Sequence, residues 1–203
     1  MILSNVKYFC LHHRPLTERK DYLLERFAAL NLDVEWVTGF EPETLTLPEG
    51  SSFKNIGEYS LYLKHQYCFE QQVANNYEFI VIFEDDALLE DNFNDYFKTC
   101  LNEFKTLDGD LMFLGICCDI KPSSIIPGKH VYWEPGYTSR CTHCYVTTLP
   151  AAKTLLRDFQ FNQMAADYKI NEIIRSNNLK SCYAEPGIHQ GSHGGKFKGS
   201  LTN

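Results

Sequence analysis

Residues 78–90 read EFIVIFEDDALLE, so an apolar run ends abruptly at three acids, Glu84, Asp85 and Asp86. A continuous apolar run of this length is typical of a strand that is buried on both faces, as in a parallel sheet covered by helices. Adjacent carboxylates at the end of such a strand repel one another unless a cation offsets their charge. The segment therefore predicts an α/β fold with an acidic site at the end of a central strand.

The rest of the chain alternates between strand and helix patterns, which favours a single α/β domain with a mostly parallel mixed sheet flanked by helices. The predicted strands are 6–11, 34–37, 78–83, 110–114, 131–133, 141–148 and 181–184. The predicted helices are 17–30, 56–75, 93–107, 150–159 and 167–177, with Tyr59, Leu63, Tyr67 and Val73 facing inward in the second. We found no repeat or interdomain linker, so residues 1–203 are treated as one domain ending in a Gly-, His- and Lys-rich tail, 186–203.

Composition excludes several classes of protein. The 203 residues are 44% hydrophobic and carry a formal net charge of −7, which argues against nucleic acid as a partner. The sequence shows no signal peptide and no apolar stretch long enough to span a membrane. We therefore expect a cytoplasmic protein (the host cytoplasm if the chain is viral) with reduced cysteines, and no zinc site at the CxxC of residues 141–144.

The acids at 84–86 suit a divalent cation. In open α/β sheets, ligands bind beyond the carboxyl ends of the strands. Oxygen ligands favour Mn²⁺ or Mg²⁺, which bind one or two carboxylates together with substrate phosphates. The alternative is a solvated, charged turn with no ligand.

The tail offers further groups for such a site. Its glycines let backbone N–H groups approach an anion. His189 and His193 are candidate metal ligands, and Lys196 and Lys198 are candidate partners for phosphate. The alternative is a frayed terminus.

Several ordered segments resemble glycosyltransferase family 25, the group of lipopolysaccharide and collagen glycosyltransferases, and the chain is similar also to glycosyltransferase domains of algal viruses. The segments are YFCLHHRPLTERK (8–20), WVTG (36–39), GEYSLYLKH (57–65), FEDDA (83–87), residues 110–115, THCYV (142–146), AAKTLL (151–156), Asp167 and the tail residues Pro186, Gln190, Gly191 and Ser192. Lys64 departs from the pattern, because serine is usual there. The segments span nearly the whole chain, although each is short.

The resemblance implies a GT-A fold and a hexosyltransferase type of enzyme that uses a nucleotide-sugar donor, a UDP-sugar above all, with Mn²⁺ or Mg²⁺. By analogy Asp86 binds the metal, with His189 and His193 as further ligands, and Glu84 or Asp85 faces the ribose or sugar. The donor-binding residues predicted in this way are Leu11, Arg14, Arg19, His65, Glu84, Asp85 and Lys196.

The expected reaction moves the sugar to a hydroxyl of a glycan or glycoprotein acceptor. If the anomeric centre inverts, a carboxylate must deprotonate that hydroxyl, and Asp167 is our candidate. Its alternative role is helix N-capping. His143 and Tyr145 are candidates to line the acceptor side or to belong to the core. A non-catalytic nucleotide-sugar-binding module and a metal-dependent phosphohydrolase stay open as alternatives.

Overall fold

The computed structural model of the protein describes residues 6–115, 125–133, 139, 141–161, 163–192 and 195–197. Its centre is a seven-stranded sheet in the order β2-β1-β3-β7-β5-β8-β6. The strands are β1 (Val6–Leu11), β2 (Val34–Val37), β3 (Phe79–Glu84), β5 (Leu111–Phe113), β6 (Val131–Trp133), β7 (Cys144–Thr148) and β8 (Ser181–Ala184). β6 and β7 run antiparallel to the others, so the predicted mostly parallel mixed sheet is confirmed.

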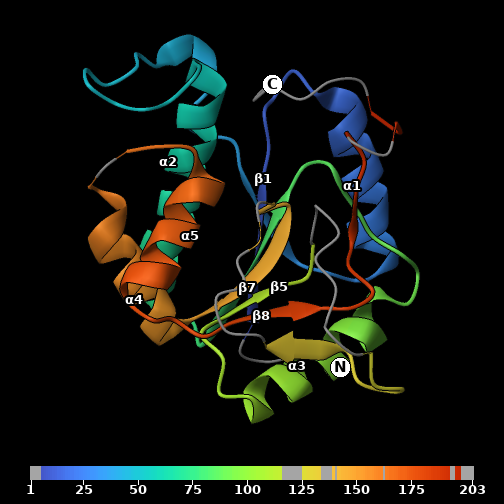
Figure 1. The fold of residues 1–203 in the computed structure, drawn as a ribbon. Coiled ribbons are helices and arrows are strands. Elements are labelled where there is room, and N and C mark those ends of the chain that lie inside the picture. Colours follow the sequence, from blue (N-terminus) through green and yellow to red (C-terminus); the bar gives the residue numbers. More distant parts are fainter. Residues whose placement is uncertain are drawn as a thin grey trace.

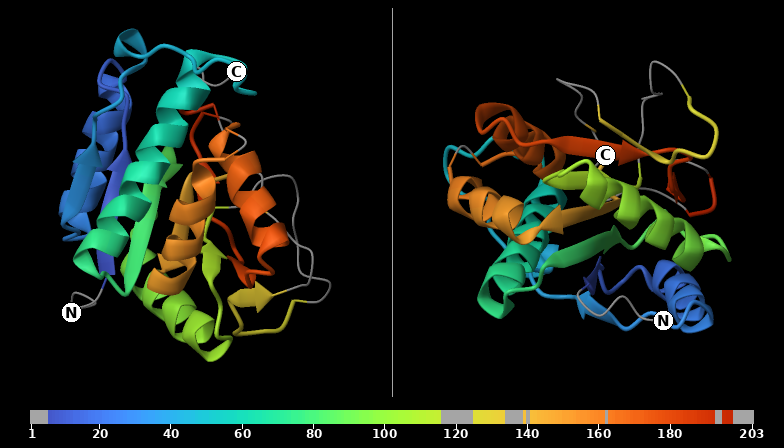
Figure 2. Two further views of the ribbon diagram at one scale, coloured as in Figure 1. Left: turned by 90° about the vertical axis from the view of Figure 1, so that its left-hand side faces the viewer. Right: turned by 90° about the horizontal axis from the view of Figure 1, so that it is seen from below.

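Helices cover both faces of the sheet and form a three-layer structure (Figures 1 and 2). α1 (Thr17–Ala29) and α3 (Phe93–Thr106) lie on one face. α2 (Ile56–Asn75), α4 (Leu149–Phe159) and α5 (Ala166–Ser176) lie on the other. A short 3₁₀ helix, η1 (Pro42–Thr44), lies in the loop between β2 and α2. The predicted helices are confirmed, with bounds that differ by one residue or less.

Strand β3 is buried on both faces, as its continuous apolar run predicts. Phe79, Val81 and Phe83 pack into the core beneath α1 and α3. Ile80 and Ile82 pack into the core beneath α2, α4 and α5. Successive side chains of a strand point to opposite faces, so one strand contributes to both halves of the core.

The inward residues predicted for α2 are confirmed in part. Tyr59, Leu63 and Tyr67 are partly buried and pack against the core, and Val73 is partly buried as well. The fully buried face of the helix carries polar residues among its apolar ones: Glu58, Lys64, His65 and Gln72 beside Tyr62, Cys68 and Phe69. Apolar spacing could not locate this face, because the polar residues on it find hydrogen-bond partners in the interior.

Two short strands fold the tail onto the acidic segment, and the sequence patterns did not predict them. β4 (Ala87–Leu88) pairs antiparallel with β9 (His189–Gln190). Phe197 is buried against the Tyr22 ring on α1, with ring centroids 5.7 Å apart. The described part of the tail therefore packs on the domain and is not a frayed terminus.

The cysteines differ from expectation at one position. Cys141 is disulfide-bonded, so the prediction that the cysteines stay reduced is wrong there. Residues 141–143, predicted to be the start of a strand, lie before β7, which begins at Cys144. The other cysteines in the described residues are free and buried: Cys10, Cys68, Cys100, Cys144 and Cys182.

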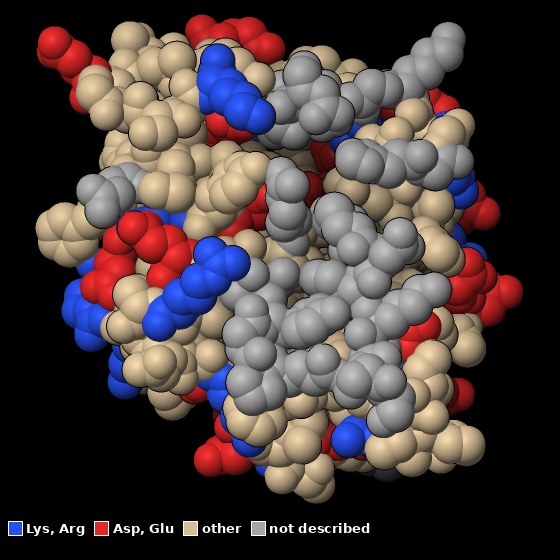
Figure 3. Space-filling view, in the orientation of Figure 1, with Lys and Arg blue, Asp and Glu red and all other residues tan. Residues whose placement is uncertain are grey.

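Charged side chains of both signs occur on the surface, and the helices can be compared with the requirements of a membrane span. Figure 3 shows Lys and Arg side chains interspersed with Asp and Glu over the described part of one face. Among the helices of the described residues, none combines the length and apolar character needed to cross a membrane.

Gly109 tests the packing of α3 against the sheet. A Cβ added there would lie 2.2 Å from Cε2 of Phe104, whose ring is buried and cannot move aside. We expect Gly109→Ala to lower the free energy of unfolding by about 1–3 kcal/mol in urea titrations, the usual cost of overpacking. Gly39 is the matched control, because no atom lies within 4 Å of its added Cβ. Gly39→Ala should be neutral or stabilising, and a similar loss in both variants would contradict the packing described here.

Candidate functional site

The acidic segment lies at the edge where the carboxyl ends of the parallel strands meet. Leu11, the last residue of β1, is in register with Glu84 at the end of β3. The N–H of Glu84 donates to the carbonyl of His143, just before β7, over 2.9 Å. The loops after β1 and β3 and before β7 therefore converge here, as expected for the ligand edge of an α/β sheet.

Asp85 is the most fully bonded of the three acids. Its Oδ2 accepts from the His12 ring (2.9 Å) and from the His13 backbone N–H (3.2 Å). Its Oδ1 accepts from Arg19 over 2.8 Å. Burial acts to raise the pKa of Asp85, but the hydrogen bonds from His12 and Arg19 outweigh it and lower the pKa. Asp85 is therefore a buried anion that joins β3 to the turn after β1 and to α1.

Asp86 is buried but incompletely bonded. Ser192 donates its hydroxyl to Oδ2 over 2.5 Å, whereas Oδ1 is buried without a hydrogen-bond partner. Arg19 lies 3.9 Å from Oδ2. Burial, followed by the nearby charge of Glu84, raises the pKa of Asp86. An uncompensated buried carboxylate oxygen of this kind is suited to a cation.

Glu84 is held by groups from α2 and from the segment before β7. Thr142 donates its hydroxyl to Oε1 over 2.6 Å. His65 Nε2 lies 3.8 Å from the same oxygen, too far for a hydrogen bond, while His65 Nδ1 is 2.8 Å from the Tyr145 hydroxyl. Burial acts to raise the pKa of Glu84, but His65 and Thr142 outweigh it and lower the pKa. The neighbouring acids Glu84 and Asp86 thus have pKa values shifted in opposite directions.

His65, His143 and Tyr145 are core residues that support this edge. All three are buried. His143 Nε2 is 2.8 Å from the carbonyl of Ile188, so it connects β7 to the tail. A Cβ added at Gly115 would lie 2.1 Å from this nitrogen, so the glycine leaves room for the ring. Of the two alternatives for His143 and Tyr145, core packing is the one observed.

The tail reaches the site through Gly191 and Ser192. The N–H of Gly191 donates to the carbonyl of Asp86 over 2.7 Å, next to the Ser192 contact. His189 is exposed and lies opposite Leu88 in the β4–β9 ladder, two residues before Gly191. The diagonal neighbour of His189 in this pairing is Asp86, two residues before Leu88. Diagonal neighbours lie ~7–8 Å apart between Cα atoms, so the two side chains are within reach of a shared ion. His193 and Lys198 lie outside the described residues.

The remaining predicted residues lie around the same edge. Arg14 is exposed, and its backbone N–H donates to Glu41. Lys196 Nζ lies 3.6 Å above the Tyr22 ring on α1.

Asp167 is in the first turn of α5, where its Oδ1 accepts from the Tyr168 N–H. Because α5 precedes the parallel strand β8, its first turn lies on the side of the sheet where the carboxyl ends meet. Asp167 is not the N-cap, which is Ala165.

Sequence patterns missed several residues that build the site. Thr142 and Ser192 hold carboxylates, and His12 holds Asp85. Lys64, where serine is usual in the resemblance, is buried and donates to the carbonyl of His12 (2.8 Å) and to Glu41 (3.2 Å). The lysine at this position could have indicated the contact with Glu41, because a lysine on the buried face of a helix requires an acidic partner.

Potential metal ligands gather in one other place. Within the described residues, three side chains that could share an ion converge only at His13, Glu41 and Glu43. The acids at 84–86 do not form such a group, because Asp85 turns away from its neighbours and accepts a hydrogen bond from Arg19 on α1. Asp86 would therefore hold an ion with help from water, substrate or the tail.

The two aspartates should differ in their effect on stability. Asp85→Asn leaves Arg19 buried without its anion, so we expect a loss of about 3–5 kcal/mol in the free energy of unfolding at pH 7 with EDTA. Because its folded pKa lies below the unfolded one, this stabilisation is present above about pH 4 and is lost as pH falls through the folded pKa.

Asp86→Asn is the matched control. The pKa of Asp86 is raised, so its ionised form costs stability at pH 7 in the metal-free protein, and its removal should be neutral or stabilising. Equal losses in the two variants would contradict the division of roles between Asp85 and Asp86.

Comparison with known proteins gives a consistent family. Residues 14–116 match the model of "Glycosyltransferase family 25 (LPS biosynthesis protein)". A "Glycosyltransferase 25 family member" of Aedes aegypti is 25% identical over 183 residues, which is 78% of this chain and 28% of that protein. A "Probable inactive glycosyltransferase 25 family member 3" of Rattus norvegicus is 30% identical over 93 residues, 40% of this chain and 16% of that protein.

The chain spans less than a third of the length of these relatives. Among solved structures, it is similar to a glycosyltransferase involved in the glycosylation of the major capsid of PBCV-1, with 12% identity and a TM-score of 0.42. That match covers 77% of this chain and 67% of the other. The family model matches half of the chain, and the matched part includes β2 to β5 and the acids at 84–86. The chain belongs to glycosyltransferase family 25.

Proposed function

We propose that this chain is a metal-dependent glycosyltransferase that moves a sugar from a nucleoside-diphosphate donor, a UDP-sugar, to a hydroxyl of a glycan or protein-linked acceptor. The observation that carries the proposal is the buried, unpartnered Oδ1 of Asp86 at the ligand edge of the sheet. Family membership supplies the class of reaction.

Asp86 fits Mn²⁺ or Mg²⁺ by its donor atom and its charge. Ser192 fixes Oδ2, which leaves Oδ1 as the oxygen for an ion. A bound cation would offset both the burial of Asp86 and the repulsion from Glu84 that raise its pKa. His189 is the further ligand that we propose from the described part of the tail. His193, the other candidate, stays a prediction.

The donor would place its diphosphate at Asp86. A divalent ion there supplies Lewis-acid stabilisation of the negative charge that grows on the leaving diphosphate. Arg14 is exposed beside this edge and is free to reach a phosphate oxygen with its guanidinium. Lys196, exposed above Tyr22, offers a second positive charge. Arg19 acts through Asp85, whose anion it holds in place.

Glu84 and Asp85 would contribute differently to donor binding. Asp85 uses both oxygens within the protein, so we assign it a positioning role. Glu84 keeps one oxygen outside the Thr142 contact and has a lowered pKa, so it is an anionic acceptor for a ribose or sugar hydroxyl. Leu11 contributes the end of β1 against which this segment is aligned.

Asp167 is our candidate for the general base of an inverting reaction. It lies in the first turn of α5 on the same side of the sheet as the acids, and it is partly exposed. A carboxylate there could accept the proton of the acceptor hydroxyl as the bond to the anomeric carbon forms. The anomeric configuration of the product, read by NMR, tests inversion directly.

Two other functions make different predictions. A non-catalytic nucleotide-sugar-binding module would bind the donor without turnover, and one rat relative carries the description "Probable inactive". A metal-dependent phosphohydrolase would release phosphate from simple esters. The turnover experiment below tests the binding module, and release of phosphate from a simple ester in the presence of Mn²⁺ would favour the phosphohydrolase.

Donor binding is the first test. We expect UDP to bind in calorimetry with Mn²⁺ present, and Asp86→Asn to weaken that binding at least tenfold while the circular dichroism spectrum is unchanged. Asp21→Asn, an exposed aspartate on α1, is the control and should bind as the wild type does. Equal Mn²⁺-dependent affinity in Asp86→Asn and wild type would remove Asp86 from the metal site.

Turnover is the second test. With nucleotide sugar, Mn²⁺ and an acceptor, Asp167→Asn should lower kcat by about 10²–10⁴-fold with little change in donor affinity, the usual contribution of a general base. Asp21→Asn again serves as the control. Unchanged kcat in Asp167→Asn would show that another group accepts the proton. Donor binding with no acceptor-stimulated release of nucleotide would favour the binding module.

A further inference from the structure

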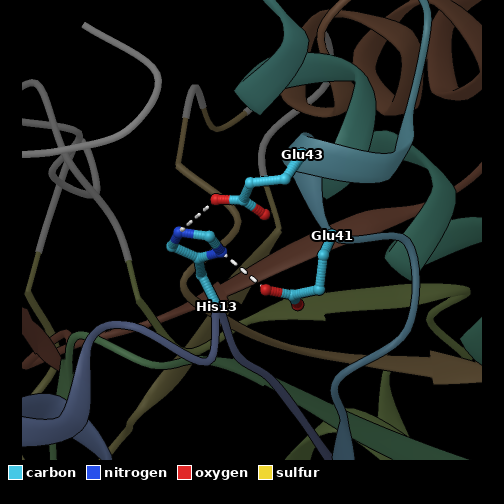
Figure 4. A group of neighbouring side chains, drawn as sticks. All are labelled: His13, Glu41 and Glu43. Carbon is cyan, nitrogen blue, oxygen red and sulfur yellow. Dashed lines mark hydrogen bonds and ion pairs between the residues drawn. The ribbon is translucent and has the colours of Figure 1, made fainter.

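A second set of metal-binding groups lies in the turn after β1 and the η1 loop. His13, Glu41 and Glu43 each offer a ligand atom within 4.8 Å of the others. Figure 4 shows the two glutamates approaching the imidazole from the same loop, one at each ring nitrogen. His13 and Glu41 are largely buried, with side chains 10% and 12% exposed, whereas Glu43 is 64% exposed. The cluster is therefore open to solvent on the Glu43 side only.

The hydrogen bonds fix which ring nitrogen is protonated. Glu41 Oε2 is 2.8 Å from His13 Nδ1. Glu41 also accepts from the Lys64 ammonium at Oε1 and from the Arg14 backbone N–H at Oε2, both over 3.2 Å, so its carboxylate acts as an acceptor toward His13. Nδ1 must therefore carry the proton. A carboxylate that fixes a histidine tautomer in this way is the usual support of a metal-binding imidazole.

The other nitrogen is turned toward Glu43 at a distance that suits a shared ion. Nε2 and Glu43 Oε1 are 3.7 Å apart, beyond hydrogen-bond range. Two ligands at Zn²⁺ bond lengths and a tetrahedral angle are about 3.4 Å apart. A small rotation of the exposed Glu43 side chain would provide that spacing.

We propose that His13 Nε2 and Glu43 bind a divalent transition-metal ion such as Zn²⁺ or Co²⁺, with Glu41 orienting the imidazole. Imidazole with carboxylate suits these ions better than Mg²⁺, which prefers oxygen alone. With the ion, Glu41, Glu43 and Lys64, the cluster has a net charge of +1. Its remaining coordination positions, filled by water, would therefore favour an anion. The inference goes beyond the proposed glycosyl transfer and does not depend on it.

Lys64 and Asp85 connect this site to the acidic segment. Lys64 donates to Glu41 and to the carbonyl of His12, and the His13 N–H donates to Asp85. The proposed ion is thus separate from the one proposed at Asp86, although both lie at the same edge of the sheet. An alternative state of His13 is an imidazolium paired with both glutamates, which leaves no lone pair for a metal.

Metal titration of the whole chain distinguishes these states. Zn²⁺ alone is added to Asp86→Asn, which lacks the other proposed ligand, and binding is followed by calorimetry and by the ¹⁵N resonances of the His13 ring. We expect one bound Zn²⁺, a shift of Nε2 from a free lone pair to a metal-bound nitrogen, and an unchanged protonated Nδ1. Adding Glu43→Gln should weaken Zn²⁺ binding at least tenfold.

Glu49→Gln, an exposed glutamate of the same loop, is the matched control and should leave Zn²⁺ affinity unchanged. Because Glu43 is exposed, Glu43→Gln should fold normally, which thermal unfolding checks. Three outcomes would overturn the proposal. They are equal Zn²⁺ affinity with and without Glu43→Gln, a His13 ring protonated on both nitrogens at pH 7 in the presence of Zn²⁺, and Zn²⁺ binding that disappears already in Asp86→Asn.

Discussion

The buried anion of Asp85 sets the arrangement of the whole site. Taking a carboxylate out of water costs several kcal/mol, and here a guanidinium, an imidazole and a backbone N–H together compensate it. Arg19 comes from α1 and His12 from the turn after β1, so this one side chain joins three segments. Since Asp85 faces these donors, its neighbour Asp86 is the acid that retains a buried oxygen without a hydrogen-bond partner.

Helix α2 supports both the acidic segment and the cluster of His13, Glu41 and Glu43. Lys64 reaches the turn after β1 and Glu41, while His65, the next residue, lies beside Glu84 and Tyr145. Burial lowers the pKa of Lys64, and the acid Glu41 opposes that shift. The polar residues of this helix are therefore buried because they position the edge loops, at a cost that a purely apolar helix would avoid.

Sequence patterns predicted the elements well and their side-chain roles less well. The apolar run of β3 and the helical spacings locate the layers, because burial of apolar surface decides where these segments lie. β4 and β9 have two residues each, too few to show a period. Adjacency in sequence could not separate Asp85 from Asp86, because their orientation depends on Arg19 and Ser192, which lie 66 and 106 residues away along the chain.

The pKa of Glu84 is lowered and that of Asp86 is raised, and the causes of these two shifts show that this edge of the sheet is under electrostatic strain. Glu84 is stabilised as an anion by Thr142 and His65, and its charge then raises the pKa of Asp86. The neutral hydroxyl of Ser192 bonds Oδ2 of Asp86 and leaves Oδ1 without a partner. It therefore does not remove the repulsion between Glu84 and Asp86. A cation at Oδ1 would reverse the sign of the interaction. The same anion that destabilises ionised Asp86 would then strengthen ion binding, so the repulsion between neighbouring acids favours a ligand that carries positive charge.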